Sequence, residues 1–409
     1  MRFTPINYTC PSCGAPLKYS PLTGTLHCEF CKREVPIEGK HAPIVEHDLH
    51  TALATLDHAP NQEITKEITC PKCGGSFTLD PYAVSGNCPY CGTPAITEFV
   101  QDIHPESILP FQVPHQEAQK IFARWIGSLW FAPGALKHLV DTQKSLIGYY
   151  LPWWTYDADT VTEYTGQRGI VYYVTVQKRM IVNGEERLVE VQEPRIQWTP
   201  VSGQVAHNFD DVTIRASRGL SRQILDALEP WDTSQLVPFD PKYLSGFDAE
   251  EYTIGLDNGF ELARVRMDAI IRSDIRSDIG GDQQQIADYH THYHNTTYKN
   301  TLFPLWMTHF TYRGKEYYYA INGQSGRITG ERPYSYTKIT LLVLSILAVL
   351  FFAAFFDQIR ERYVENFSNN SAPKTYPAVP PTSADIFGDI TACESNGGVW
   401  NYVNERCER

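Results

Sequence analysis

The sequence predicts an α+β multidomain chain with two four-cysteine zinc ribbons, a central, mostly antiparallel α+β domain and one C-terminal transmembrane helix. Three observations support this fold class. Cysteine pairs occur in two matched sets near the N-terminus, the middle of the chain alternates between helical and strand patterns, and residues 339–356 are apolar without a charge. With 409 residues, the chain is long enough for two or three domains.

Changes in composition and pattern set the expected boundaries. The segments are a first zinc ribbon at 1–40, a linker at 41–66, a second zinc ribbon at 67–104, the central α+β domain at 105–333, the transmembrane helix at 338–357, a Pro-rich linker at 358–392 and a disulfide-stapled tail at 393–409. The first linker combines polar residues with one short helical pattern, so we expect it to be partly flexible.

Eight cysteines form an internal repeat with a period of sixty residues. They are Cys10, Cys13, Cys28 and Cys31, followed by Cys70, Cys73, Cys88 and Cys91. A Cys-x-x-Cys turn supplies two thiolates from one knuckle, and two knuckles complete the tetrahedral shell that zinc prefers. Gly14, Gly74 and Gly92 fit such turns because glycine tolerates positive φ. The sequence therefore predicts two zinc ions in closed sites, which stabilise small modules and leave no open position for catalysis.

Other chemistries of the cysteine pairs remain alternatives. Iron in a rubredoxin-like site uses the same four thiolates. Redox-active pairs fit less well, because a thioredoxin-like frame needs one Cys-x-x-Cys pair and this chain has four pairs in two matched sets.

The charge of the chain bears on what the ribbons bind. The formal net charge is −12, and residues 1–104 hold seven basic side chains against eleven acidic ones. Binding to a phosphate backbone requires clustered Lys and Arg. A protein partner is therefore favoured, and nucleic acid stays open as the alternative.

The central segment alternates helical and strand patterns. Apolar residues at three-four spacing predict a helix over 115–129, with further helices around 218–228 and 249–275. β-Branched and aromatic residues predict strands over 148–167, 169–193, 286–299 and 301–323. A hairpin turn is expected at Asn183 and Gly184. This pattern favours an antiparallel sheet.

Three histidines alternate along one predicted strand. His290, His292 and His294 would project from the same face, a spacing compatible with a metal site. The favoured interpretation is a polar outer face, on which these histidines are solvated. The residues between and before them, Tyr289, Thr291 and Tyr293, would then turn inward.

Two carboxylates form a second polar pattern. Asp157 and Asp159 share a strand face and could act as an acid–base pair, although solvation or hydrogen bonding to turns is the favoured interpretation. The sequence has no phosphate loop, nucleotide-binding glycine motif, Gly-x-Ser-x-Gly elbow or His-Glu-x-x-His motif. An enzyme of unknown class in the central domain is therefore the second alternative function, and a protein without catalytic activity is favoured.

The uncharged stretch at 339–356 is long enough to cross a bilayer. Eighteen helical residues extend about 27 Å, close to the hydrocarbon thickness of a membrane. A buried core helix is the alternative, but such a helix normally carries a polar stripe.

Both ends of the chain bear on its orientation. Three basic residues precede the apolar stretch and two follow it, which favours a cytoplasmic N-terminus only slightly. Cys393 and Cys407 bracket a loop too small to bury a core, so we expect them to form a disulfide in an oxidising compartment. The first ten residues do not resemble a signal peptide. We therefore expect a single-pass protein of the bacterial inner (cytoplasmic) membrane, with the C-terminus periplasmic or external.

Several further stretches carry a resemblance to a known family. They are the CPxCG ribbons, ILPFQV at 108–113, LWFAP at 129–133, PWWTYDADTVTEYTGQRG at 152–169, LFPLWMTHFTY at 302–312 and YYYAINGQSGRITGE at 317–331. With them the chain resembles a family of bacterial zinc-ribbon membrane proteins of unsettled function, often labelled primosomal or replication helicase-like. The resemblance covers most of residues 70–356 and implies a cytoplasmic ribbon and α+β region attached to the membrane. The helicase label gains no support, because the sequence has no phosphate-binding loop.

The expected function is a membrane-anchored zinc-ribbon adaptor or scaffold that recruits a protein partner to the cytoplasmic face. Two ribbons on one chain would bind bivalently and so raise avidity. The alternative is a nucleic-acid-binding replication or transcription accessory protein, whose binding would fall steeply with salt. The patterns predict no oligomeric state.

Overall fold

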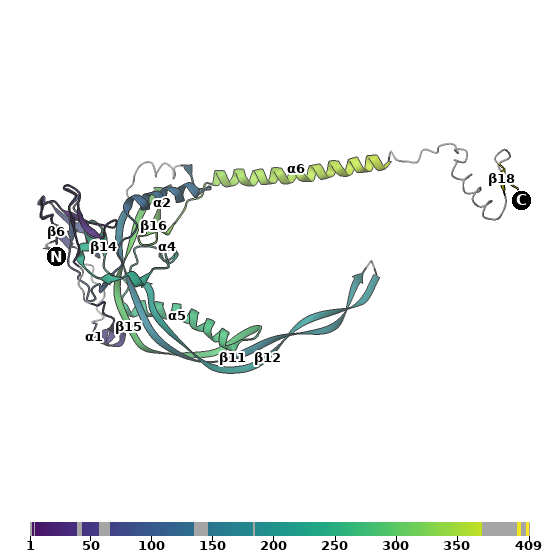
Figure 1. Cartoon of the computed structure of the whole chain (residues 1–409), viewed down its shortest axis with the longest axis horizontal. Coiled ribbons are helices and arrows are strands. Elements are labelled where there is room, and N and C mark those ends of the chain that lie inside the picture. Colours follow the sequence, from purple (N-terminus) through teal and green to yellow (C-terminus); the bar gives the residue numbers. More distant parts are fainter. Residues whose placement is uncertain are drawn as a thin grey trace. The chain divides into compact units, whose positions relative to one another are not determined.

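The computed structural model describes residues 2–3, 5–38, 43–56, 66–134, 146–182, 185–369, 399–401 and 406–408 (Figure 1). The chain divides into two compact units, Met1–Tyr334 and Ser335–Arg409. The cysteine-rich segments and the central segment belong to the same unit, so the boundary expected at residue 104 does not separate compact units. The end expected for the central domain, at residue 333, lies one residue from the observed division.

Three long strands form the frame of the first unit. β11 (Ile147–Val182) pairs antiparallel with β12 (Glu185–Arg215) on one side and with β15 (Gln283–Tyr312) on the other. They belong to an eleven-stranded sheet with the order β13-β10-β15-β11-β14-β8-β9, to which β5, β12, β16 and β17 add at the sides. The predicted turn at Asn183 and Gly184 lies outside the described residues.

The other strands of this sheet are short. They are β5 (His47–Asp48), β8 (Ala83–Asn87), β9 (Pro94–Ile96), β10 (Ser107–Ile108), β13 (Val237–Pro238), β14 (Asp248–Glu250), β16 (Lys315–Asn322) and β17 (Ile328–Gly330). Parallel pairing occurs between β10 and β15 and between β11 and β14, and both ladders are only two residues long. The predicted α+β fold with a mostly antiparallel sheet is confirmed.

The helices of the first unit lie between these strands in the chain. They are α1 (Leu49–Thr55), α2 (His115–Ser128), α4 (Arg222–Ala227) and α5 (Leu256–Ile279), with 3-10 turns η1 (Thr233–Gln235) and η2 (Pro241–Leu244). The helix predicted over 115–129 and the short helix in the first linker are confirmed.

Two predicted helix starts were wrong, because the backbone at those positions forms hydrogen bonds with strands or loops instead of with a helix. The helix expected from residue 249 begins at Leu256, since β14 inserts between β11 and β8. The helix expected from residue 218 begins at Arg222, because the Thr253 N–H donates to the Ala216 carbonyl (2.8 Å) and the Arg218 N–H donates to Thr253 Oγ1 (3.0 Å). Because the N–H groups of this segment already have hydrogen-bond partners outside the helix, the segment stays extended.

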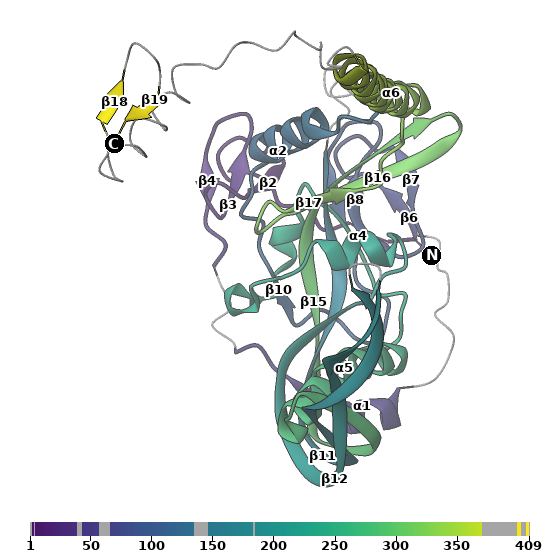
Figure 2. The same ribbon diagram turned by 90° about the vertical axis from the view of Figure 1, so that its right-hand side faces the viewer.

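Helix α5 packs against the long strands (Figure 2). One face of the helix is buried, with a residue every four positions: Ala263, Met267, Ile271, Ile275 and Ile279. Below its first turn, Trp154 Nε1 donates to the Ile254 carbonyl (2.9 Å) and the Tyr156 hydroxyl donates to the Leu256 carbonyl (2.8 Å). Gly259 lies directly over this pair, where a Cβ would come within 2.7 Å of Trp154 Cδ1. The absence of a side chain at residue 259 therefore lets the helix approach the sheet.

Two cysteine modules complete the first unit. The first cysteine module (residues 5–38) contains a separate antiparallel sheet of β2 (Leu17–Ser20), β3 (Thr25–Cys28) and β4 (Glu34–Val35). The second cysteine module (residues 66–97) contains β6 (Lys66–Thr69) and β7 (Ser76–Leu79), joined by β1 (Arg2–Phe3), and the hairpin β8–β9. That hairpin pairs with β14, so the second module is continuous with the large sheet.

The second unit contains one long apolar helix, α6 (Tyr336–Asn369). Its apolar window, Tyr336–Arg360, is 25 residues long and none of it is buried, unlike a core helix. The helix continues past the end expected at residue 357, because its sequence DQIRERYVENFSN contains neither Pro nor Gly. β18 (Val399–Asn401) and β19 (Arg406–Glu408) pair antiparallel in the tail. The expected disulfide lies outside the described residues, since Cys393 and the side chain of Cys407 are not among them.

Candidate metal centres

The four cysteines of each set converge. In the first cysteine module, the Sγ atoms of Cys10 and Cys31 lie 3.5 Å apart, as do those of Cys13 and Cys28. In the second, the corresponding distances are 3.6 Å for Cys70–Cys91 and 3.8 Å for Cys73–Cys88. All four sulfurs of each set lie within 4.8 Å of one another. The predicted ligand sets are thus brought together as two four-cysteine clusters.

The backbone builds every cysteine pair in the same way. At the first pair, the Cys10 N–H donates to the Ala15 carbonyl (2.7 Å) and the Gly14 N–H donates to the Cys10 carbonyl (2.9 Å). The other three pairs repeat this arrangement. Gly14, Gly74 and Gly92 have φ of 70°, 74° and 68°, as the turn requires. Lys32 occupies the fourth equivalent position with φ of 59°, so one knuckle adopts the left-handed conformation without glycine.

Each cluster contains sulfurs of lowered and of raised pKa. Backbone N–H groups act to lower the pKa of Cys13, Cys31 and Cys73, but hydrogen bonds between neighbouring sulfurs raise it above the usual value. The backbone N–H of Ser12 is the main cause that lowers the pKa of the Cys10 thiol to about 6. At the other cluster, the hydroxyl of Thr93 is the main cause that lowers the pKa of Cys91 to about 6. Since a metal binds the thiolate rather than the thiol, these donors prepare Cys10 and Cys91 for metal ligation.

The sulfur geometry fits a tetrahedral metal ion. With metal–sulfur bonds of about 2.3 Å, the edge of a tetrahedron of sulfurs is about 3.8 Å. The distances of 3.5–3.8 Å match this edge. Cys10, Cys28, Cys70 and Cys88 are buried, whereas Cys13, Cys31 and Cys73 are exposed. Each cluster can therefore hold one ion in a closed shell near the surface, and four protein ligands leave it no position for a substrate.

An exposed aromatic side chain lies beside each cluster, and it was not predicted from the sequence. Phe30 lies between Cys28 and Cys31 and is 73 % exposed, and Tyr90 lies between Cys88 and Cys91 and is 68 % exposed. Because the positions differ by the same sixty residues as the cysteines, the repeat itself could have found them.

The histidine strand has the arrangement that the sequence favoured. His290, His292 and His294 are exposed, while Tyr289 and Tyr293 face α5, where Arg272 and Arg264 stack over their rings at 5.3 Å each. The His290 and His292 rings lie 4.7 Å apart and the His292 and His294 rings 6.4 Å apart. Within the described residues, the groups placed to hold a metal do not include these histidines.

Asp157 and Asp159 have separate partners. Asp157 accepts hydrogen bonds from the Asp211 N–H (2.6 Å) and the Thr297 hydroxyl (2.9 Å), and burial raises its pKa to about 6. Asp159 accepts from the side chains of Asn295 and Asn208, which lower its pKa. The structure therefore holds the two carboxylates in different networks rather than as an acid–base pair.

Asp157 also belongs to an acidic group that an ammonium already neutralises. Its carboxylate lies with those of Asp210 and Asp211 at metal-ligand spacing. Lys299 Nζ lies 2.6 Å from Asp211 Oδ1 and 2.8 Å from Glu46 Oε1, and the lysine is 6 % exposed. The buried ammonium supplies the positive charge that these acids need, so we assign no metal there.

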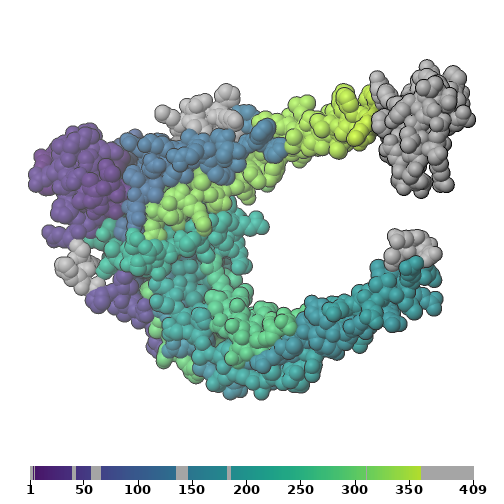
Figure 3. All heavy atoms as spheres, turned by 45° about the vertical axis from the view of Figure 1, so that its right-hand side comes forward, coloured from purple at the N-terminus to yellow at the C-terminus, as the bar shows by residue number. Residues whose placement is uncertain are grey.

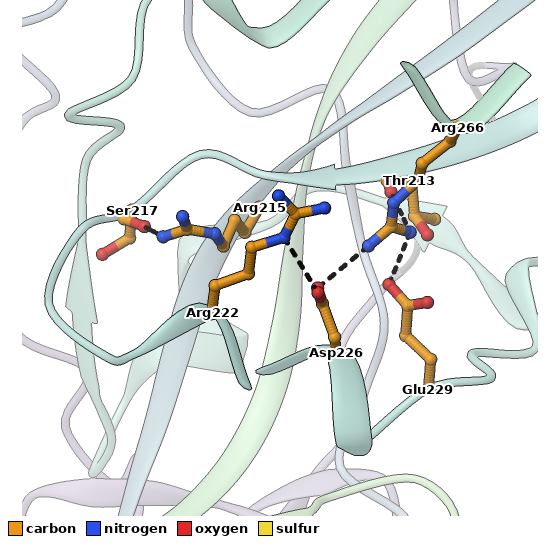
Figure 4. Close-up of polar contacts among 7 residues, drawn as sticks. All are labelled: Thr213, Arg215, Ser217, Arg222, Asp226, Glu229 and Arg266. Carbon is orange, nitrogen blue, oxygen red and sulfur yellow. Dashed lines mark hydrogen bonds and ion pairs between the residues drawn. The ribbon is translucent and has the colours of Figure 1, made fainter. Parts of the chain in front are cut away.

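An arginine cluster links α4, α5 and β12 (Figure 4). Arg266 of α5 donates to Glu229 (2.7 Å), Asp226 (3.0 Å) and the Thr213 carbonyl (2.8 Å), and Arg222 pairs with the same Asp226 (3.0 Å). Ion pairs also form within α5, between Arg264 and Glu261 and between Arg272 and Asp268.

Beside this cluster, Arg215 points toward Ser217 and donates to the Ser217 carbonyl at 3.2 Å (Figure 4). Burial is the main cause that lowers its pKa, and the charges of Arg222, Arg218 and Arg266 lower it further. The carboxylates of Asp226 and Glu229 offset part of this positive charge. The contacts of Arg266 join α5 to the segment of α4 and to β12.

Comparison with known proteins found one relative. This chain is similar to YdjG of Bacillus subtilis (strain 168), described as an uncharacterized protein, with 26 % identity over 350 residues. The match covers 85 % of this chain and 96 % of the relative. No family model matches the chain, and no solved structure matches it.

Proposed function

We propose that this protein is a membrane-anchored adaptor of the bacterial zinc-ribbon membrane family that the sequence resembles. In this proposal the cysteine modules are zinc ribbons that hold a protein partner at the cytoplasmic face of the inner membrane. The observation that carries it is the presence of two closed four-cysteine clusters on a chain that also has a helix of membrane-spanning length. Closed clusters organise a surface and do not catalyse.

The proposed contact surface lies beside the clusters. Phe30 and Tyr90 present large rings next to rigid knuckles, and Leu22 in the first cysteine module is 79 % exposed. Exposed apolar side chains on a rigid support are typical anchors for protein partners. The net charge of −12 argues against a nucleic-acid partner, which also uses aromatic rings but requires basic residues.

The proposed anchor is α6. Its apolar window of 25 residues would extend about 37 Å, enough to cross the hydrocarbon layer. Between Gly330, the end of β17, and Tyr336, the start of α6, the chain can extend at most about 20 Å. We propose that the N-terminal unit is cytoplasmic and the tail external, because eight thiolates suit a reducing compartment. A bacterial relative that matches 85 % of this chain supports the bacterial assignment.

The test is an affinity pull-down of the detergent-solubilised chain, with metal content measured on the same sample. We expect two zinc ions per chain and a protein partner that resists nuclease. Replacing both rings, Phe30→Ala with Tyr90→Ala, should abolish capture and leave two zinc ions bound. The matched control is Val265→Ala on α5, where a 64 % exposed side chain is truncated away from the clusters.

Other outcomes would contradict parts of this proposal. Iron in place of zinc would overturn the metal assignment. Nucleic acid released by moderate salt would favour the accessory-protein alternative. Unchanged capture by the Phe30/Tyr90 variant would overturn the proposed surface.

A further inference from the structure

The hairpin of β11 and β12 projects as a two-stranded ribbon beyond the elements that support it (Figures 1 and 3). Strand β15 follows β11 only as far as the pair Gly169–Gln283, and α5 ends at Ile279. From Ile170 to Val182, β11 pairs with β12 alone among the described strands. A two-stranded ribbon without further support is marginally stable in water.

Hydrogen bonds show where the outer edge of β11 becomes open. The Val171 N–H donates to Asp282 Oδ2 (2.7 Å) and the Asp282 N–H donates to the Gly169 carbonyl (2.9 Å), so the N–H of Val171 points away from β12. Because backbone direction alternates along an antiparallel ladder, every second residue after Val171 points the same way. The open edge therefore presents the backbone of residues 173, 175, 177, 179 and 181.

The outer edge of β12 is blocked, and this supports the alternation independently. Pro194 pairs with Tyr173 and Pro200 pairs with Gln167, both odd-numbered positions of β11. Proline has no N–H, and within sheets it occurs where the N–H would face outward on an edge strand. Proline on an edge also prevents pairing with another chain. The distal part of β11, residues 170–182, contains no proline.

The distal part of β11 has the composition of a strand that pairs. Its large apolar side chains are exposed, with Tyr173 at 65 % and Ile181 at 75 %. It contains two basic residues, Lys178 and Arg179, and no acidic residue. An open, apolar edge of this kind is a site for strand addition.

We propose that the open edge of β11 pairs antiparallel with the same edge of a second copy of this chain, about a two-fold axis at Gln177. This register uses all five outward-facing residues on each chain. It places Tyr173 opposite Ile181, Thr175 opposite Arg179, Gln177 opposite Gln177, Val174 opposite Met180 and Val176 opposite Lys178.

The charges of Lys178 and Arg179 favour this antiparallel register. In the antiparallel pairing, Lys178 faces Val176 and Arg179 faces Thr175, so like charges are not opposed. A parallel in-register pairing would stack lysine on lysine and arginine on arginine, which is unfavourable. An antiparallel two-fold pairing is also closed, so the assembly ends at two copies.

The first experiment is cross-linking in isolated membranes, with Cys393→Ser and Cys407→Ser to remove the tail thiols. With a short bismaleimide, Gln177→Cys should yield a product of twice the chain mass. The matched control is Gln192→Cys, because Gln192 is also an exposed glutamine and pairs with Thr175 from β12. It lies on the blocked side of the ribbon and should stay monomeric. A Gln177→Cys product with a different protein, or no product, would overturn the second copy as the occupant.

The second experiment breaks the pairing by proline. Thr175→Pro removes an outward N–H and no hydrogen bond within the ribbon, so the detergent-corrected mass from light scattering should fall from two chains to one. Gln192→Pro removes an outward N–H from β12 two residues before Pro194, and it should remain a dimer. A monomeric unmodified chain, or equal masses for the two proline variants, would contradict the proposed edge.

Discussion

Lys66 and Glu251 form an ion pair inside the first unit: Lys66 Nζ lies 3.4 Å from Glu251 Oε2, and the side chains are 0 % and 2 % exposed. Lys66 begins β6 of the second cysteine module, and Glu251 follows β14. Lys66 also donates to the Ala83 carbonyl (3.0 Å), and Glu251 accepts from the N–H groups of Gln101 (3.2 Å) and Val100. Burial lowers the pKa of Lys66, which the negative charge of Glu251 opposes.

Replacing Glu251 by Gln should therefore destabilise the protein strongly. The change leaves a buried ammonium without its counter-ion, and breaking such a pair costs about 3 kcal/mol. The midpoint of denaturant unfolding, followed by tryptophan fluorescence in detergent, measures the loss. Glu261→Gln is the matched control, because its partner Arg264 is exposed and the pair should contribute less than about 1 kcal/mol. Equal midpoints for the two variants would show that the buried pair does not contribute.

The carboxyl group of Asp248 should make stability depend on pH. Burial raises its pKa to about 6, against about 3.9 in an unfolded chain. The folded state therefore binds the proton more tightly, and this contribution is complete below about pH 4 and is lost as pH rises through 6. Asp248→Asn mimics the protonated form and should stabilise the protein at pH 7.5 by about 1–2 kcal/mol.

Unfolding midpoints at pH 7.5 and pH 5 measure this difference, which should shrink to about half at the lower pH. Asp288→Asn is the control, because that side chain is exposed and should change stability little at either pH. A destabilised Asp248→Asn variant at pH 7.5 would mean that the ionised carboxylate is the favoured form.

Lys299 should hold the acidic group of the sheet together. Lys299→Met leaves Glu46 and Asp211 without their partner and Asp157 without a nearby positive charge, so we expect a loss of about 2–4 kcal/mol at pH 7.5. The loss should be smaller at pH 5, where the carboxylates can take up protons. Thermal unfolding at the two pH values measures it.

The control for this change is Lys120→Met, because Lys120 pairs with Glu117 on the exposed surface of α2. Adding Asp157→Asn to Lys299→Met should restore part of the stability, since one uncompensated acid is removed. An additive further loss would show that Asp157 is stabilised by its hydrogen bonds rather than by Lys299.

The approach of α5 to the sheet should depend on Gly259. In Gly259→Ala the new Cβ would collide with Trp154 and the Tyr156 hydroxyl, so the helix must move away from the sheet. We expect this movement to lower the free energy of unfolding by about 1–3 kcal/mol. Gly127→Ala on α2 is the matched control, since no atom lies within 4 Å of its Cβ. That change should stabilise the protein by about 0.5–1 kcal/mol through helix propensity. Thermal unfolding measures both variants, and equal shifts of the two unfolding temperatures would contradict the close approach of α5 to the sheet.

The sequence predicted features whose causes are local. The knuckle turns follow from Cys-x-x-Cys and the residues that accept positive φ, and α2 follows from three-four spacing. The apolar helix was predicted because an uncharged apolar stretch of eighteen residues is typical of a membrane span and lacks the polar stripe of a core helix. The apolar window ends at Arg360, three residues past the end expected for the membrane span, and the helix itself continues through a polar segment to Asn369.

Features that join distant parts of the chain could not be predicted. Lys66 and Glu251 are separated by 185 residues, and each alone looks like an ordinary surface charge. Arg266 sits in a helix rich in acids, yet its partners Asp226 and Glu229 come from another segment. The helical pattern at 249–255 is overridden in two ways. β14 pairs residues 249 and 250 with β11 and β8, and the N–H groups of Glu251, Thr253 and Ile254 donate to the carbonyls of Tyr82 and Ala216.

The two cysteine modules are attached to the body in different ways, and their loss would have different consequences. The first has its own sheet and meets the body through contacts such as the Ser245 hydroxyl on the Leu17 carbonyl (2.7 Å). The second shares β8 with the large sheet. The first module also shares an apolar core with the body, since Leu17, Tyr19 and Leu26 pack in one cluster with Tyr150 and Trp306. Loss of an ion from the first cluster would therefore loosen side-chain packing, whereas loss of an ion from the second would loosen strand pairing.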